Sequence, residues 1–189
     1  KYGGDIAVGA MTILTSVMQF AMLPAQGIAQ GAQPILSYNY GAKNAERVKS
    51  AFKVFLVICT SYIFIFGMLV QGFPEFFIGI FNDNPDLVDT ATWTIRLYGC
   101  AMTFFGIQMA VQQTFIALGK AKASLFIACL RKVILLVPLI YILPNFFEDK
   151  VFAVFLAEPV SDAISIITAS IVFFFVFRKE MKQLKAETN

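Results

Sequence analysis

The sequence predicts an all-α, polytopic transmembrane helix bundle, and three observations support this fold class. Hydrophobic residues make up 58% of the chain and charged residues 14%, whereas soluble domains contain roughly 45–50% apolar and about 25% charged residues. The apolar residues gather in five blocks, and each block reaches the roughly 20 residues that cross about 30 Å of hydrocarbon. Charged residues gather mainly between these blocks, so the chain belongs in a lipid bilayer.

The first three expected spans are long apolar blocks. Residues 6–36 form the first block, residues 51–81 the second and residues 91–118 the third. Each contains interior Gly or Pro residues, such as Pro24 in the first. Transmembrane helices tolerate these residues because neighbouring groups satisfy the freed carbonyls. We therefore expect three helical crossings here, with a kink at Pro24.

The last two expected spans cover residues 124–143 and 151–177. Their interior prolines, Pro138 and Pro159, predict further kinks. Residues 1–178 are thus expected to form the transmembrane bundle. Residues 179–189, in which Lys and Glu alternate, are expected to form a short cytoplasmic tail.

The connections between the expected spans divide by charge. Basic residues dominate the first and third connections and the tail, namely Lys43, Arg47, Lys49, Lys53, Lys120, Lys122, Arg178, Lys179, Lys182 and Lys185. The alternate connections carry mainly acids, namely Asp83, Asp86, Asp89, Glu148 and Asp149 beside Lys150. Because basic connections stay in the cytoplasm, we expect an external N-terminus and a cytoplasmic C-terminus in the plasma (inner) membrane.

The start of the chain predicts a piece of a longer protein. It begins at Lys1 without an initiator Met and without the short apolar region of a signal peptide. An odd number of spans with an external start is natural for a fragment that lacks at least one preceding helix.

The stretch from Gly27 to Asn44, GIAQGAQPILSYNYGAKN, carries the most specific signal in the sequence. Its small residues let another helix approach closely. Pro34 is expected to end or bend the helix, and Asn39 and Gly41 to accept turn conformations. The basic stretch that follows is expected to lie along the inner interface as an amphipathic segment.

The spacing GxxQGxQPxxxxNYGA resembles the signature loop of the multidrug and toxic compound extrusion (MATE) family, which lies between the second and third helices of each half. The residues that carry this resemblance include Gly31, Gln33, Pro34, Asn39, Tyr40, Gly41 and Ala42. Residues 113–122 are similar to the end of the family's helix ten, and residues 131–144 to its helix eleven. Residues 158–162, EPVSD, look like the Pro-x-x-Asp element of helix twelve.

The resemblance implies that the five spans are helices eight to twelve, most of the C-terminal lobe of a twelve-helix transporter. It also implies alternating access between two six-helix lobes, with export of cationic or amphipathic compounds in exchange for protons or sodium. The partners would be the missing N-terminal lobe of the same polypeptide, the substrates and the bilayer. No cofactor is expected beyond the coupling ion. One departure concerns that ion, because several members place an acid in helix ten or seven. This chain has no Asp or Glu in residues 91–118.

Ionisable residues inside spans are costly, and are therefore functional candidates. They are Arg96, Arg131, Lys132, Glu158 and Asp162. At about 1.5 Å per residue, Arg131 and Asp162 reach similar depths near mid-membrane, and Arg96 and Glu158 both lie roughly 9–10 Å from the outer edge. We expect two ion pairs, Arg131 with Asp162 and Arg96 with Glu158. They either fix helix packing or supply a carboxylate that binds a proton or cation during transport.

Uncharged polar and aromatic side chains offer a second set of candidates, for a substrate cavity. The glutamines Gln26, Gln30 and Gln33 follow helical spacing, as do Gln108 and Gln112, so that each group can line one helix face. Aromatic rings could add stacking and cation–π contacts to bulky cations. The aromatic candidates are Tyr38, Tyr98, Phe104 and Phe105.

Several functional classes lack support in this sequence. The absence of His removes the commonest general base and most zinc sites, and Cys59, Cys100 and Cys129 are too widely spaced for a metal knuckle. We predict neither an enzyme nor a nucleic-acid-binding protein. Two alternatives to drug export remain, a flippase of lipid-linked saccharides in the same broad superfamily and a membrane scaffold without a transport cycle.

Overall fold

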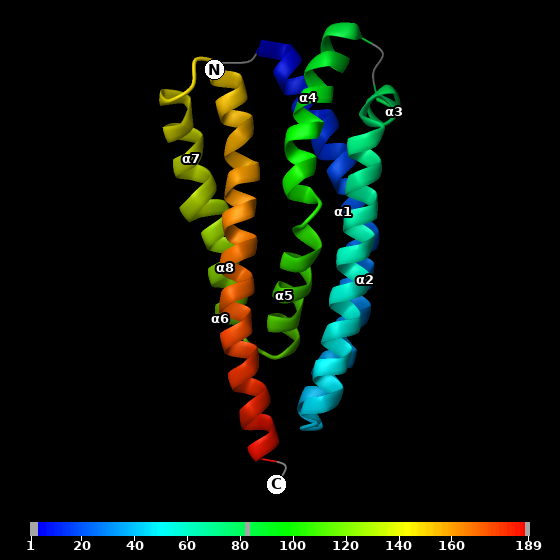
Figure 1. Ribbon diagram of the computed structural model, residues 1–189, viewed down its shortest axis with the longest axis vertical. Helices are drawn as coiled ribbons and strands as arrows, with labels where there is room; N and C mark the ends of the chain where they lie inside the picture. The colour runs from blue at the N-terminus through cyan, green and yellow to red at the C-terminus, as the bar shows by residue number, and fades with distance from the viewer. Residues whose placement is uncertain (1–3, 82–83, 188–189) are drawn as a thin grey trace.

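The computed structural model describes residues 4–81 and 84–187, and its long helices run roughly along one axis (Figure 1). In chain order the elements are α1 (Gly4–Gly41), α2 (Ala45–Gly72), α3 (Pro74–Gly79), α4 (Pro85–Met102), α5 (Phe105–Ala117), α6 (Ala121–Cys129), the π-helix η1 (Leu130–Leu136), α7 (Val137–Ile142), the 3-10 helix η2 (Leu143–Asn145) and α8 (Lys150–Ala186). All elements in the described residues are helical, which confirms the predicted all-α fold class.

Four continuous helical stretches are long and apolar enough to cross a membrane: Ile6–Gly41, Ala45–Gly72, Ala121–Asn145 and Lys150–Ala186. The remaining expected crossing, residues 91–118, is divided between α4 and α5, which follow one another in the same direction (Figure 1). As a result, the start of α1 and the end of α8 lie at opposite ends of the bundle.

Helix α1 continues seven residues beyond Pro34, to Gly41, so of the two expected effects of Pro34 an end of the helix is wrong, and a bend stays a prediction. Pro34 removes only the backbone donor to the carbonyl four residues earlier, a loss that helices in apolar surroundings tolerate. Beyond Pro34, the Ser37 hydroxyl donates to the Pro34 carbonyl (3.2 Å) and the Asn39 amide to the Ile35 carbonyl (2.7 Å). The reversal comes later, at Lys43, which has a positive φ of 56°. Thus the expected turn at Asn39 and Gly41 is displaced by a few residues.

The basic stretch after this turn is the start of α2 itself rather than a separate interfacial segment. Asn44 caps the helix, because its side chain accepts a hydrogen bond from the Arg47 backbone amide (3.0 Å). Helix α2 ends at Gly72, earlier than the expected residue 81. The residue before a proline disfavours helical dihedrals, and Phe73, which precedes Pro74, has φ −130° and ψ 53°.

The joint between α4 and α5 lies at Thr103 and Phe104, where the bundle is tightly packed. The Thr103 hydroxyl donates to the Gly99 carbonyl (2.7 Å). A Cβ on Gly106, in the first turn of α5, would lie 2.8 Å from the Cα of Thr60 in α2. Such a short separation means that only glycine lets α5 approach α2 this closely.

Helix α8 extends well past the expected span of residues 151–177. Asp149 caps its first turn by accepting hydrogen bonds from the backbone amides of Val151 (2.9 Å) and Phe152 (3.1 Å). The helix then continues to Ala186. The expected tail of residues 179–189 is therefore, as far as residue 186, the continuation of α8.

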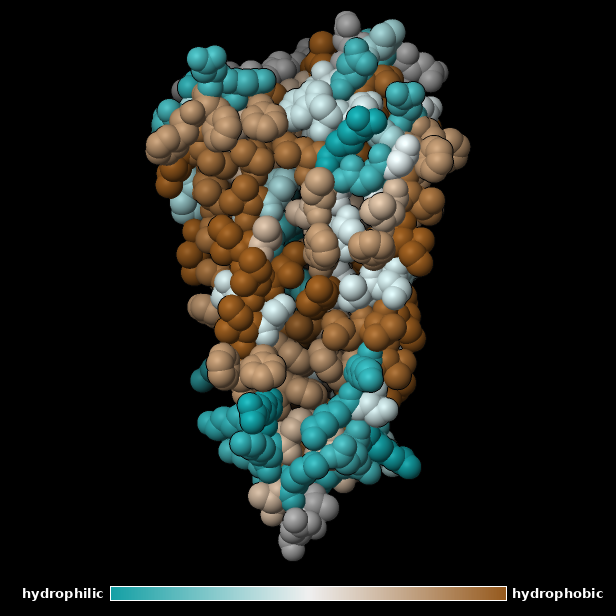
Figure 2. Space-filling model, in the orientation of Figure 1, coloured by the Kyte–Doolittle hydropathy of each residue, from teal (hydrophilic) through white to brown (hydrophobic). Residues whose placement is uncertain are grey.

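The surface separates into an apolar band with polar residues at both ends (Figure 2). One end, which we call the basic end, is where α1 ends, α2 and α6 begin and α8 finishes. There Glu180 accepts from both Lys120 (2.7 Å) and the Tyr40 hydroxyl (2.7 Å), and Lys43 pairs with Glu187 (3.0 Å). At the opposite end, the expected acid Asp83 lies outside the described residues.

Candidate functional site

The charged residues expected inside the membrane meet where η1 packs against α8. Arg131 and Lys132 lie on η1, and Glu158 and Asp162 lie one turn apart on α8. We call these four residues the charge cluster. Both bases lie on one side of the helix contact and both acids on the other, so that each charge faces an opposite one.

Arg131 and Asp162 form the buried pair of this cluster. The Arg131 Nε lies 2.5 Å from Asp162 Oδ1, and the second guanidinium nitrogen lies 3.2 Å from Oδ2. This fork geometry is the strong form of a charge-assisted hydrogen bond. The side chains are only 18% and 5% exposed. The predicted Arg131–Asp162 pair is therefore confirmed.

Two neighbours complete the surroundings of Arg131. Its guanidinium lies 4.4 Å from the centre of the Phe105 ring, a cation–π contact. Its backbone carbonyl accepts a hydrogen bond from the Ser161 hydroxyl (2.7 Å). Arg131 thus connects η1 to both α5 and α8.

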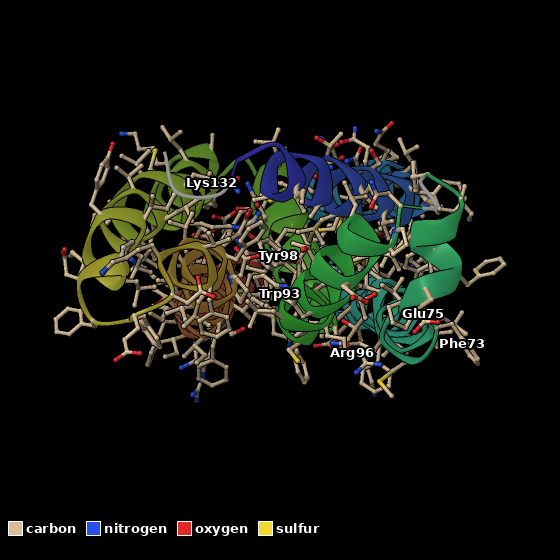
Figure 3. All side chains as sticks on the ribbon, turned by 90° about the horizontal axis from the view of Figure 1, so that it is seen from above. Phe73, Glu75, Trp93, Arg96, Tyr98 and Lys132 are labelled. Carbon is tan, nitrogen blue, oxygen red and sulfur yellow. The ribbon has the colours of Figure 1, made fainter. Side chains whose placement is uncertain are left out.

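The second expected pair, Arg96 with Glu158, is wrong. Glu158 pairs instead with Lys132, at 2.7 Å. Figure 3 shows Arg96 on one flank of the bundle and Lys132 on the other, with Trp93 and Tyr98 between them. Counting residues matches the depths of Arg96 and Glu158 along the membrane, but α4 turns the Arg96 side chain to the exposed outer surface.

Two consecutive basic residues of η1, Arg131 and Lys132, both reach acids of α8. Adjacent residues on an α-helix diverge by about 100°, which separates them onto different faces. Residues 130–136 wind as a π-helix, whose wider turns reduce the angle between consecutive residues. This π-helix lies directly before Pro138, whose ring would crowd the carbonyl four residues earlier in a regular α-helix. The kink expected at Pro138 stays a prediction; what the structure places before this residue is the π-helix, and such turns frequently occur at functional sites.

Polar residues extend the charge cluster along α8 towards α5. The Gln108 amide donates to the Ser165 hydroxyl (3.1 Å), while the Gln108 Oε1 has no hydrogen-bond partner among the described residues. Gln108 is 1% exposed, and buried acceptors in proteins nearly always have a hydrogen-bond donor. The arrangement therefore offers one oxygen to a water molecule or a donor group.

Sequence reasoning missed the two serines of this face, although the signal was present. Residues 158, 161, 162 and 165 follow the i, i+3, i+4, i+7 spacing of one helix face. Glu158, Ser161, Asp162 and Ser165 together present two carboxylates and two hydroxyls towards η1 and α5.

The predicted cavity residues are dispersed in this chain. Gln33 accepts a hydrogen bond from Gln113 (2.7 Å), which joins α1 to α5, and Tyr98 is buried at 4% exposure. Gln112 is half-buried. Four other candidates are exposed, namely Gln26, Gln30, Tyr38 and Phe104. Their role in a substrate cavity stays a prediction.

Metal binding has no evident basis in the described part of the chain. Over residues 4–81 and 84–187, no group of three or more His, Cys, Asp or Glu residues could hold a metal ion. The charge cluster has one basic partner for each carboxylate.

Comparison with known proteins agrees with this picture. The family model described as MatE matches residues 1–142. Multidrug export protein MepA of Staphylococcus aureus (strain MSSA476) is 25% identical over 145 residues, which cover 76% of this chain and 32% of that protein. MepA of Staphylococcus saprophyticus is 22% identical over 186 residues, 97% of this chain and 40% of that protein. This chain thus spans about a third to two-fifths of the length of these relatives.

Solved structures share the fold. A MATE crystal structure in the bent conformation has a TM-score of 0.84 at 17% identity. The matched region covers 98% of this chain and 40% of the chain in that structure. The MATE multidrug transporter DinF-BH has a TM-score of 0.80 at 29% identity, with 91% of this chain and 38% of its own covered.

Proposed function

Because this chain belongs to the MatE family, whose model matches residues 1–142, we propose that its parent protein exports drug-like or toxic compounds by cation-coupled antiport. The relatives support export, since MepA is a multidrug export protein and DinF-BH is a multidrug transporter. The single observation that carries the proposal is this family membership. The protein is an integral membrane protein, and we place it in the plasma membrane with the basic end in the cytoplasm.

The charge cluster supports coupling to an ion, and the two pairs differ in how well they suit it. Asp162 is nearly fully buried and held by two contacts from Arg131. Glu158 is 20% exposed, lies close to the Tyr98 hydroxyl and makes one ion-pair contact, with Lys132, which is itself 50% exposed. A pair with one contact and access to solvent can open and accept a proton or sodium ion more readily. We therefore assign coupling to Glu158 and packing to Asp162.

The test is efflux of a fluorescent cationic dye from cells that express the full polypeptide, under imposed proton and sodium gradients. We expect gradient-dependent efflux, and the active gradient identifies the coupling ion. Glu158→Gln should lower the efflux rate without lowering the inserted amount, because the neutral amide cannot take up and release a proton. Asp162→Asn should lower the amount of folded protein, while the inserted molecules retain gradient-dependent efflux.

Glu148→Gln is the matched control, because Glu148 is exposed in the connection before α8. This substitution should leave the efflux rate and the inserted amount unchanged. Gln33→Ala removes the Gln113 contact and tests the predicted cavity. If a well-inserted parent protein showed no efflux under either gradient, drug export would be refuted and the flippase or scaffold functions favoured. Full efflux in Glu158→Gln would remove the coupling role of Glu158.

A further inference from the structure

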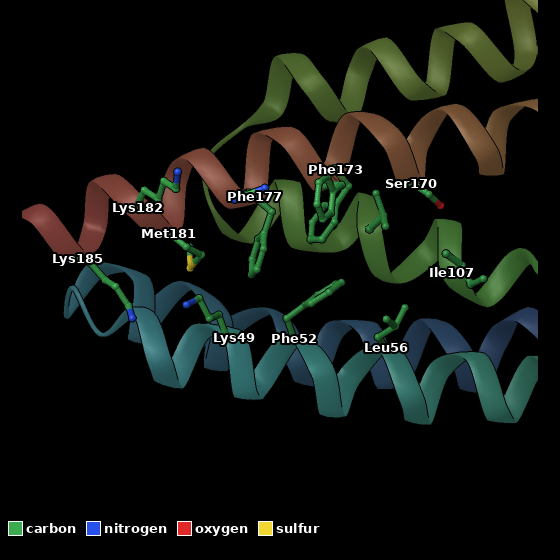
Figure 4. A pocket seen from close by; sticks show the side chains of 13 residues that line it. Lys49, Phe52, Leu56, Ile107, Ser170, Phe173, Phe177, Met181, Lys182 and Lys185 are labelled. Atoms are coloured by element: carbon green, nitrogen blue, oxygen red, sulfur yellow. The ribbon is translucent and has the colours of Figure 1, made fainter.

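A groove at the basic end, away from the charge cluster, has an apolar wall that the proposed transport cycle does not use. It lies between α2, α5 and α8 and has a volume of about 680 Å³ (Figure 4). Four phenylalanine rings line its wall, and three of them pack together. Phe173 and Phe177 stack with centroids 4.8 Å apart, and Phe52 lies 4.6 Å and 5.1 Å from them. Leu56 and Ile107 extend the apolar wall towards the middle of the bundle.

The rim of the same groove is basic. Arg178, Lys182 and Lys185 line it from α8, and Lys49 from α2. The three residues on α8 follow the i, i+4, i+7 spacing of one helix face. Figure 4 shows Lys49, Lys182 and Lys185 at one end of the groove, with Leu56 and Ile107 towards the other. Charge and apolar surface are thus separated along its length.

The rim is only partly neutralised. Glu46 pairs with Lys49 at 3.4 Å and with Lys185 at 2.5 Å. Arg178 and Lys182 form no ion pair with an acid of the described residues, and both are exposed. Two cations therefore face the groove with their charge available.

This arrangement matches an amphiphile that carries a negative head and a long apolar chain. From Ser170 to Lys185 the groove follows α8 for on the order of 22 Å, half apolar and half basic. Arg binds phosphate oxygens through a planar fork. Basic residues beside a membrane helix attract anionic lipid headgroups. We propose that this groove binds one anionic diacyl phospholipid, with its phosphate on Arg178 and Lys182 and an acyl chain against Phe52, Phe173 and Phe177.

Other occupants fit less well. A small soluble anion would leave the aromatic wall without a partner. A zwitterionic lipid has a net charge of zero and would gain little from two available cations. The anionic phospholipid is the occupant that complements both halves of the groove.

The test is native mass spectrometry of the full polypeptide in detergent, with phosphatidylglycerol or phosphatidylcholine of identical acyl chains added. We expect the unmodified protein to bind phosphatidylglycerol more tightly. The double variant Arg178→Gln/Lys182→Gln should weaken phosphatidylglycerol binding by about 10- to 30-fold and leave phosphatidylcholine binding unchanged. The matched control is Lys53→Gln/Lys122→Gln, which removes the same charge at the basic end from two exposed residues that do not line the groove.

A variant without a charge change tests the apolar half. Leu56→Trp fills the groove and should weaken binding of both lipids, while the thermal midpoint shows that the protein remains folded. Equal affinity of the unmodified protein for the two lipids would overturn the proposal. So would a loss of phosphatidylglycerol binding in the control as large as in the double variant. Because lipid binding is read directly, the result does not depend on whether the protein exports drugs.

Discussion

Replacing Arg131 by Met is expected to destabilise the folded bundle by about 3–5 kcal/mol, the typical cost of removing one partner of a buried ion pair. Asp162 is 5% exposed and would keep a carboxylate with no opposite charge in contact. The substitution also removes the cation–π contact with Phe105. The measurement is the thermal unfolding midpoint of the full polypeptide in detergent, together with the folded amount recovered from the membrane.

Two further variants separate the ion pair from general damage. Lys132→Met removes the neighbouring charge, which is half-exposed and makes one contact, and should cost no more than about 1 kcal/mol. Arg131→Met/Asp162→Leu removes both buried charges and should recover most of the lost stability, because apolar pairs can replace buried ion pairs. If Arg131→Met were as stable as the unmodified protein, the pair would not hold η1 against α8.

The second large effect is expected at Gly106, where α5 crosses α2. In Gly106→Ala the new methyl group would lie 2.8 Å from the Thr60 Cα and 2.9 Å from the Cys59 carbonyl oxygen. Both are backbone atoms that cannot rotate away, so the helices must separate. We expect a loss of about 1–3 kcal/mol, the usual range for overpacking, visible as a lower thermal midpoint.

Gly72→Ala is the matched control for this substitution. Gly72 lies at the end of the same α2, and no atom lies within 4 Å of the position of its added methyl group. Its stability should change by less than about 0.5 kcal/mol. An equal loss in both variants would show that the close approach of α5 to α2 does not set the effect.

The buried pair and the groove lie at different depths and differ in physical role. Arg131 and Asp162 satisfy one another inside the apolar band. Arg178 and Lys182 lie past the end of that band, with no acid of the described residues paired to them. Buried charge is therefore internally neutral here, whereas charge at the basic end remains available to a ligand. A substitution in the buried pair should therefore change stability, whereas a substitution at the rim of the groove should change ligand binding.

The sequence by itself determined the membrane environment, the helical class and the family. Long apolar blocks allow only a bundle of helices in lipid, because every backbone group must be satisfied internally. The GxxQGxQPxxxxNYGA stretch identified the family, and the family model confirms it. Depth counting also found Arg131 and Asp162, because both lie on inward faces of neighbouring helices.

Only the tertiary structure decided which partners the other charges have and where the third expected span breaks. Residue counting measures depth along a helix but not rotation about its axis, so it pairs Arg96 with Glu158, although Arg96 faces outward. Arg131 and Lys132 both reach acids of α8 from the π-helical turn η1, which residue counting along an α-helix does not anticipate. The break at Thr103 lies where α4 and α5 pack tightly against α2, whereas the break at Phe73 follows from the local sequence, because Phe73 precedes Pro74. The sequence does not reveal such close approaches between helices, so only the tertiary structure locates the break at Thr103.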